Sequence, residues 1–193
     1  MLPHSRKRSR HVALMVMVPA ATSLLLSGCG PNRVEQGVVY QDVQECSQQN
    51  PEATALCATD YQEAQVQHQN VAPRYTTREE CESDFGTERC EAAPQQHASG
   101  SFFMPMMMGY LAGQMFSRPN VGQSATGGIP TQPLYKSRDD QSSFRTASNQ
   151  PVAAGSGAVN VRPGNVALRP ASIMRSGGFG ATAARMAASS SGS

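Results

Sequence analysis

Hydrophobic residues are grouped unevenly along this chain of 193 residues, and the first group lies near the start. Residues 12–26 are almost wholly apolar and follow four basic side chains at positions 6, 7, 8 and 10. A run of 15 residues is short for a membrane span, which needs about 20, but it suits the hydrophobic region of a secretion signal. We therefore predict a lipoprotein signal peptide over residues 1–28.

The predicted signal ends in Leu26-Ser27-Gly28-Cys29, where small residues precede a cysteine. This order is typical of cleavage before a cysteine whose thiol then carries a diacylglycerol, so we predict lipidation of Cys29. An ordinary signal peptide with an incidental cysteine, or an uncleaved anchor helix, is the alternative. Gly30, rather than an aspartate, resembles lipoproteins sorted to the outer membrane. We expect an acyl-anchored protein of the bacterial cell envelope that faces the periplasm.

Residues 29–97 contain two copies of one pattern, near 40–57 and 75–90. In each copy a capping residue is followed three positions later by a glutamate, which is the capping box of a helix start. The pairs are Asp42 with Glu45 and Thr77 with Glu80. Asn50-Pro51 predicts another helix, which runs to about His68. We therefore predict a small helical module, and we expect His68 to be packed or exposed rather than catalytic.

Each copy also carries two cysteines, which are Cys46 and Cys57 in the first and Cys81 and Cys90 in the second. An even number of cysteines in a short exported segment indicates disulfides. Pairing within each copy is favoured, and pairing between the copies is the serious alternative. A zinc site that includes His68 is conceivable, but an exported compartment favours disulfides.

Residues 98–116 form the most hydrophobic stretch after the signal, and we predict a short hydrophobic helix there. Gly109 and Gly113 are four residues apart, a spacing that lets helices approach closely. The residues predicted to contact a membrane or a protein partner of the envelope are Phe102, Phe103, Met104, Met106, Met107, Met108, Tyr110, Leu111, Met115 and Phe116. Because thioethers are soft ligands, copper handling by these methionines is the alternative function.

Residues 117–193 are rich in Gly, Ser, Ala and Pro, and large apolar residues are sparse. Such a composition predicts a mostly disordered tail, in which Gly177-Gly178-Phe179-Gly180 is a possible short contact motif. The predicted fold is therefore mainly α: a small disulfide-stapled helical module, a short hydrophobic helix and a long disordered C-terminal tail.

Charge divides the chain in the same way. Residues 29–97 hold 12 acidic and 4 basic side chains, a net charge of −8, whereas residues 98–193 hold 2 acidic and 8 basic ones, a net charge of +6. No nucleophile–base pair, phosphate-binding loop or thiol-redox motif is recognisable, so we expect no enzyme activity, no catalytic or metal-binding residues and no cofactor. We predict neither a nucleic acid nor a small molecule as partner.

Several of these segments together resemble the DUF1190 family, also called UPF0441, a group of proteobacterial lipoproteins of unknown function. The resemblance rests on the lipidation motif, the segments 40–46 and 72–90, the segment Ser99-Gly-Ser-Phe-Phe-Met-Pro-Met106, and Gly177-Gly-Phe-Gly180. It implies a cell-envelope lipoprotein without an established activity. The function expected from sequence is therefore a non-enzymatic structural or interaction component of the envelope.

Overall fold

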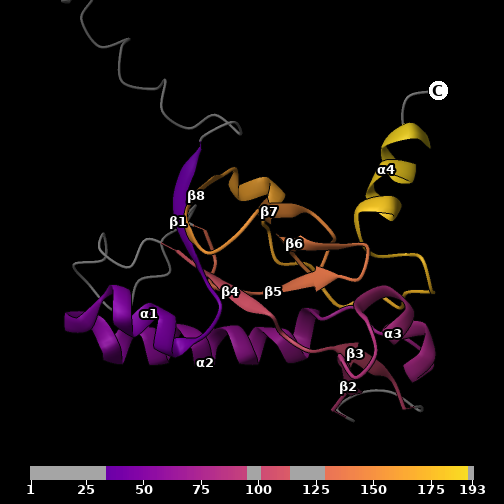
Figure 1. The fold of residues 1–193 in the computed structure, drawn as a ribbon, viewed down its shortest axis with the longest axis horizontal. Coiled ribbons are helices and arrows are strands. Elements are labelled where there is room, and N and C mark those ends of the chain that lie inside the picture. Colours follow the sequence, from indigo (N-terminus) through magenta and orange to yellow (C-terminus); the bar gives the residue numbers. More distant parts are fainter. Residues whose placement is uncertain (1–33, 95–100, 114–128, 191–193) are drawn as a thin grey trace, which may run out of the picture. The chain divides into compact units, whose positions relative to one another are not determined.

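A six-stranded antiparallel sheet dominates the computed structural model, which describes residues 34–94, 101–113 and 129–190. The strands are β1 (Glu35–Tyr40), β4 (Gly109–Ala112), β5 (Gln132–Ser137), β6 (Asp140–Arg145), β7 (Pro151–Ala153) and β8 (Gly157–Val161). Their order is β7-β6-β5-β4-β1-β8, and residues 154–156 join the two edge strands, so the sheet nearly closes on itself (Figure 1). The prediction of a mainly α fold with a disordered tail is wrong, because the tail supplies four of these strands.

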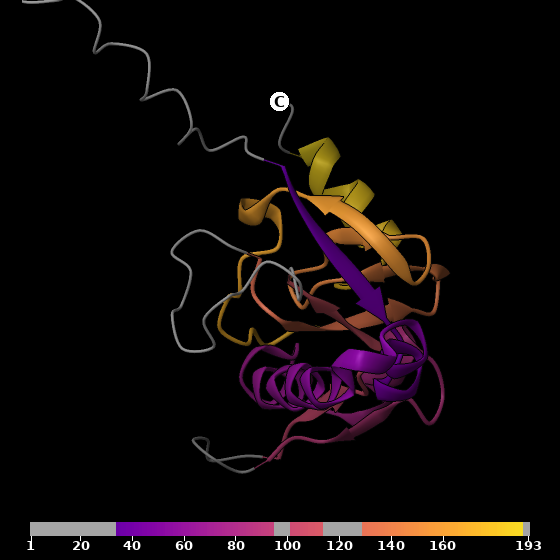
Figure 2. The same ribbon diagram turned by 90° about the vertical axis from the view of Figure 1, so that its left-hand side faces the viewer.

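Several helices accompany this sheet. They are α1 (Val43–Gln49), η1 (Pro51–Ala53), α2 (Thr54–Val71), α3 (Arg78–Phe85), η3 (Pro163–Asn165) and α4 (Ala181–Ser190). The long helix α2 packs against β4 and β5, while α3 packs on a small sheet of β2 (Cys90–Ala92) and β3 (Phe103–Pro105) (Figures 1 and 2). Among the residues that the structure describes, no helix has the length and apolar character that crossing a membrane requires.

The helix starts that the capping boxes predict are confirmed. Asp42 accepts a hydrogen bond of 2.8 Å from the backbone N–H of Glu45 at the start of α1. Thr77 accepts one of 3.2 Å from the backbone N–H of Glu80 at the start of α3. Each bond satisfies a backbone donor that the first helical turn cannot pair, and it uses only residues that are neighbours in sequence.

The described part of the hydrophobic segment, residues 101–113, forms strands β3 and β4, so the predicted short hydrophobic helix is wrong. Gly109 explains part of the error, because its small size is needed within the sheet. A Cβ atom at Gly109 would lie 2.7 Å from the carbonyl oxygen of Tyr40 on β1 and 2.8 Å from the ring of Phe144 on β6. The glycine therefore lets strands approach closely, where the spacing predicts an approach of helices.

Three clusters of buried side chains form the core, and each joins residues from distant parts of the sequence. The first includes Tyr75, Phe85, Tyr135 and Phe179. The second includes Val39, Leu111, Leu134 and Phe144, and the third includes Tyr40, Cys46, Cys57 and Tyr110. All of these residues belong to one unit of the chain, Asn32–Ser193. The acidic part and the basic tail therefore share the same hydrophobic core.

Candidate functional site

Both cysteine pairs form disulfides, and the pairing within each copy is confirmed. Cys46 on α1 bonds to Cys57 on α2, and Cys81 on α3 bonds to Cys90 on β2. All four residues are buried. Because these bonds are shielded from water, they act as structural links of the core. The predicted lipidation residue, Cys29, lies outside the described residues.

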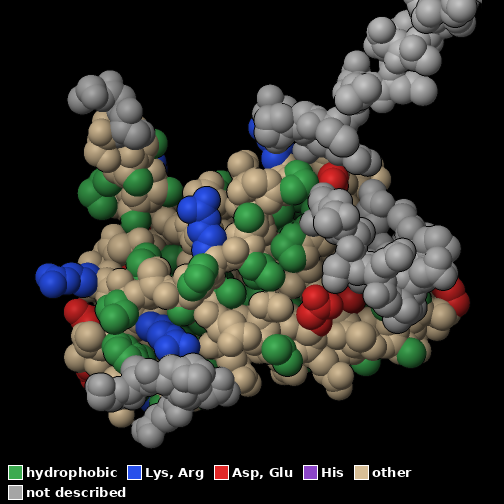
Figure 3. All heavy atoms as spheres, turned by 180° about the vertical axis from the view of Figure 1, so that it is seen from behind, with side chains coloured by type: hydrophobic (Ala, Val, Ile, Leu, Met, Phe, Trp, Pro, Cys, Tyr) green, Lys and Arg blue, Asp and Glu red, His purple; other side chains and the backbone are tan. Residues whose placement is uncertain are grey.

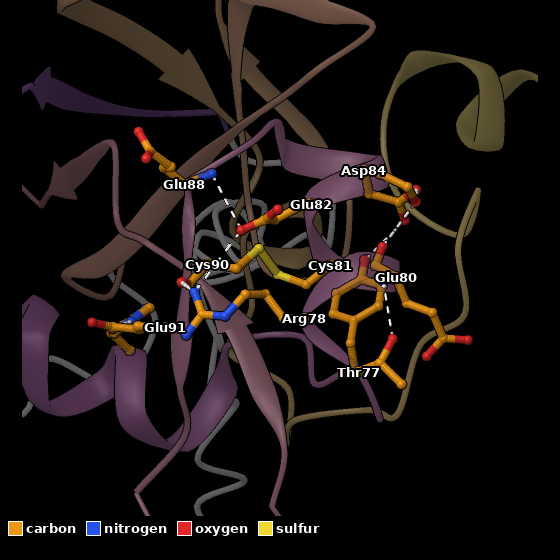
Figure 4. The surroundings of a disulfide bond; sticks show 12 residues. Thr77, Arg78, Glu80, Cys81, Glu82, Asp84, Glu88, Cys90 and Glu91 are labelled. Carbon is orange, nitrogen blue, oxygen red and sulfur yellow. Dashed lines mark hydrogen bonds and ion pairs between the residues drawn. A yellow bond between two sulfur atoms is a disulfide. The ribbon is translucent and has the colours of Figure 1, made fainter.

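Arg78 reinforces the second disulfide, as Figure 4 shows. Its Nη1 atom donates a hydrogen bond of 2.6 Å to the carbonyl oxygen of Cys90, and its guanidinium carbon lies 5.1 Å from the ring centroid of Phe103. A cation over an aromatic ring is attracted by the electron density of the ring face. One side chain therefore holds α3 against both strands of the small sheet.

The carboxylate of Asp84, near the end of α3, fixes the motif Gly177-Gly178-Phe179-Gly180. Its Oδ1 atom accepts a hydrogen bond of 2.6 Å from the backbone N–H of Gly177, and its Oδ2 atom accepts one of 3.1 Å from that of Phe179. Tyr75 donates a further bond of 2.9 Å from its hydroxyl to Oδ2. Figure 4 shows Asp84 on the helix that also carries Cys81. The contact that the sequence suggested for this motif is thus made within the chain.

Phe179 inserts into the first core cluster. Its ring centroid lies 4.6 Å from that of Phe85 and 6.3 Å from that of Tyr135, and the residue is 3% exposed. Burial of an aromatic side chain of this size contributes about 1.5–3 kcal/mol. The motif is therefore held both by hydrogen bonds to the Asp84 side chain and by apolar packing.

Gly180 and Asn149 form a reciprocal pair at the start of α4. The backbone N–H of Gly180 donates to Asn149 Oδ1 at 3.0 Å, and Asn149 Nδ2 donates to the carbonyl oxygen of Gly180 at 3.0 Å. Gly180 has a φ of +110°, a backbone conformation that residues with a side chain rarely adopt. A Cβ atom at this position would also collide with the carboxylate of Asp139. This position therefore requires glycine.

Asp139, from the turn between β5 and β6, caps α4 from outside the helix. It accepts hydrogen bonds from the backbone N–H groups of Ala181 at 3.2 Å and Thr182 at 2.8 Å. Partial burial raises the pKa of Asp139, but the bonds from Ser137, Thr182 and Ala181 outweigh this effect and lower the pKa to about 2. An ionised carboxylate thus faces the positive end of the helix dipole.

Beyond its fixed start, α4 is uncovered. None of its ten described residues is buried, and Met186 is 57% exposed. A groove of about 510 Å³ separates one side of the helix from the β6–β7 turn; its wall includes Met174 and four alanines of α4. Figure 3 shows α4 standing above the neighbouring surface with exposed hydrophobic side chains. The chain thus holds an apolar helix firmly at one end and leaves the rest open.

His68 is packed inside the fold, which is one of the two environments expected for it. Its Nδ1 atom lies 2.9 Å from the Tyr135 hydroxyl, and its Nε2 atom lies 3.1 Å from Glu91 Oε1. Burial lowers the pKa of His68, and the hydrogen bond to Glu91 raises it by less. Tyr135 is fully buried, so this chain of polar groups links α2, β5 and β2 inside the fold.

The fold divides the residues predicted for membrane or partner contact. Met104, Tyr110 and Leu111 are buried; Phe102, Phe103, Met107 and Met108 are half-buried; Met106 is 42% exposed; and Met115 and Phe116 lie outside the described residues. Core packing accounts for the hydrophobicity of the first three. For the exposed and half-buried ones, an external contact stays a prediction.

The described methionine side chains of this segment contact different parts of the fold. Met104, Met107 and Met108 pack against three separate core clusters. The sulfur of Met108 also accepts a hydrogen bond of 3.2 Å from Arg89 Nη1. These contacts assign the three thioethers to packing rather than to a shared metal ion.

Sequence reasoning missed Asp84, Asp139 and Asn149. Asp84 stands among glutamates on a short acidic helix, a pattern that is typical of an exposed charged face. The signal that could have found these residues is the glycine-rich motif itself, because exposed backbone N–H groups at such a motif need acceptors. Nothing in the local sequence, however, says which distant carboxylates supply them.

The fold is a mixed α/β domain built on a nearly closed antiparallel sheet, and no solved structure matches it. Residues 34–190 match the family model described as "Protein of unknown function (DUF1190)". The chain therefore belongs to the DUF1190 family, as the sequence resemblance predicts.

Proposed function

We propose that this protein is an acyl-anchored lipoprotein of the bacterial cell envelope that works as a non-enzymatic structural or interaction component. The observation that carries the proposal is the pair of buried disulfides in a domain whose first strand begins six residues after Cys29. Disulfides form and persist in oxidising compartments outside the cytoplasm. A lipidation motif directly before such a domain fits an exported protein held at a membrane surface.

The architecture around α4 supports an interaction role. Three side chains from separate segments (Asp84, Asp139 and Asn149) fix the backbone where the helix begins, yet the helix itself is left open to its surroundings. A fold that only needed to be stable would gain by burying these alanines and Met186. Rigid presentation of an uncovered apolar helix is typical of a contact surface.

The proposal is tested by labelling cells with an alkyne fatty acid and isolating the tagged protein. We expect label on the wild-type chain and none on the Cys29→Ala variant. A Ser47→Ala variant, which changes a small residue on α1 away from the lipidation motif, should be labelled like the wild type. Equal labelling of wild type and Cys29→Ala, or no label on either, would contradict lipidation at Cys29.

A further inference from the structure

The start of β1 and the C-terminal end of α4 lie at the same end of the described domain. Strand β1 begins at Glu35, and its register pairs Glu35 with Val161, so β8 ends beside it and Arg162 follows. In Figures 1 and 2, which share the same vertical axis, α4 extends towards this same end. A flat surface placed across this end would meet both the start of β1 and the end of α4.

Chain length sets how far this end can be from the membrane. If Cys29 carries the acyl group, as the proposed function requires, six backbone steps separate it from Glu35. An extended chain spans at most about 3.6 Å per residue, so the start of β1 stays within roughly 20 Å of the membrane surface. The lipid surface is therefore the nearest large partner for anything exposed at this end.

The chemistry of this end suits an anionic lipid surface. Arg162, directly after β8, and Arg185, on α4, carry exposed basic side chains, and Glu35 at the start of β1 carries an acidic one. Val34 and Met186 are 52% and 57% exposed. A helix that combines apolar and basic side chains binds at the boundary between headgroups and acyl chains, and each basic residue strengthens attraction to anionic lipids.

We propose that α4 lies against the anionic surface of the same membrane that holds the acylated Cys29, which makes it a second, non-covalent membrane contact. The inference rests on the proposed function. The acyl group fixes the distance of the domain from the membrane, and α4 fixes its orientation. Asp139 and Asn149 hold the start of the helix, so orientation of α4 is transmitted to the whole sheet.

The test uses the full acylated chain reconstituted in phosphatidylethanolamine vesicles with or without phosphatidylglycerol. A single thiol is introduced by Met186→Cys and labelled with an environment-sensitive fluorophore, because the four structural cysteines are paired and Cys29 is blocked by its acyl group. Val66→Cys is the matched control, since Val66 is 59% exposed on α2, at the opposite end of the domain in Figure 1. Contact is read as quenching by lipids that carry a quencher near the headgroup.

We expect quenching of the Met186 label that increases with phosphatidylglycerol and falls at high salt, with the Val66 label unaffected. Arg185→Ala should weaken the contact roughly fivefold, the effect of one basic residue near an anionic surface. Equal quenching at both positions would overturn the inference. The inference would also be overturned if the labels at position 186 quenched one another while the lipid quencher had no effect, because a second copy of the chain would then cover α4. If the chain does not float with the vesicles, the acyl anchor itself is missing, and this result contradicts the proposed function instead.

Discussion

Replacing Asp84 with alanine tests whether this one carboxylate holds the glycine-rich motif, residues 177–180, in place. The substitution removes the acceptor of hydrogen bonds from Gly177, Phe179 and Tyr75, and of a longer bond of 3.3 Å from Ser83 on the same helix. Leaving a buried donor without its acceptor costs about 1–3 kcal/mol for each bond. The N–H of Gly177 can turn to water, whereas Phe179 and Tyr75 are buried.

We therefore expect Asp84→Ala to lower the free energy of unfolding by about 3–5 kcal/mol. Asp84→Asn should lose less, because the amide oxygen keeps one acceptor. The free energy comes from urea unfolding of the oxidised full chain in detergent, followed by circular dichroism. Hydrogen exchange measured by mass spectrometry should be faster over residues 171–190, the segment that Asp84 holds through Gly177 and Phe179.

Glu79→Ala is the matched control, since Glu79 is an exposed acid on the same helix. It should change stability by less than about 0.5 kcal/mol. The reasoning is refuted if Asp84→Ala stays within about 1 kcal/mol of the control and leaves exchange over residues 171–190 unchanged. In that case Phe179 packing alone would hold the motif.

Three further predictions concern the glycine motif, the disulfide and the buried histidine. Gly180→Ala should lower the free energy of unfolding by at least about 1 kcal/mol, because Gly180 has a φ of +110°. Gly164→Ala is the control and should have little effect in the same urea assay, since an added Cβ atom at Gly164 has no neighbour within 4 Å. Replacing Cys81 and Cys90 together by alanine should cost about 2–4 kcal/mol in that assay, and a smaller loss than 1 kcal/mol would count against a structural staple. Burial lowers the pKa of His68, so the neutral imidazole stabilises the fold above pH 6.5, and this contribution is lost as the pH falls below that value. The free energy of unfolding of His68→Gln should therefore fall less steeply than that of the wild type between about pH 7.5 and 5. Parallel curves for the two proteins would disprove the assignment.

Local features of this protein could be predicted from sequence because their partners are close along the chain. The capping bonds at Asp42 and Thr77 span three residues, and the two disulfides span 11 and 9. Short loops of this kind cost little entropy to close, so the partners find one another without help from the rest of the fold.

The sheet could not be predicted, because β1 pairs with strands far along the chain and the strands use few large side chains. Glu35 pairs with Val161, more than 120 positions away. Composition misled in the tail because polar residues are buried there once they are hydrogen-bonded. Gln132, for example, is 2% exposed and donates a bond of 2.6 Å to the carbonyl oxygen of Val166. A satisfied polar side chain costs little to bury, so a low apolar content did not prevent folding.

The candidate site was hidden for the same reason. The glycine motif was visible in the sequence, but its acceptors come from α3, the β5–β6 turn and Asn149 on the β6–β7 turn. Only the folded sheet brings these segments together. The exposure of α4 was equally invisible, since ten residues of Ala, Thr, Arg, Met and Ser do not reveal which side is left uncovered.

The central claim, an exported and acyl-anchored domain with stapled cysteines, is tested most directly by the intact mass of the protein extracted from its native membrane. The measurement is made with and without reduction before thiol alkylation. We expect loss of residues 1–28, added acyl mass on Cys29, and four further alkylated cysteines only after reduction. An unprocessed mass, or four thiols that alkylate without reduction, would contradict the account.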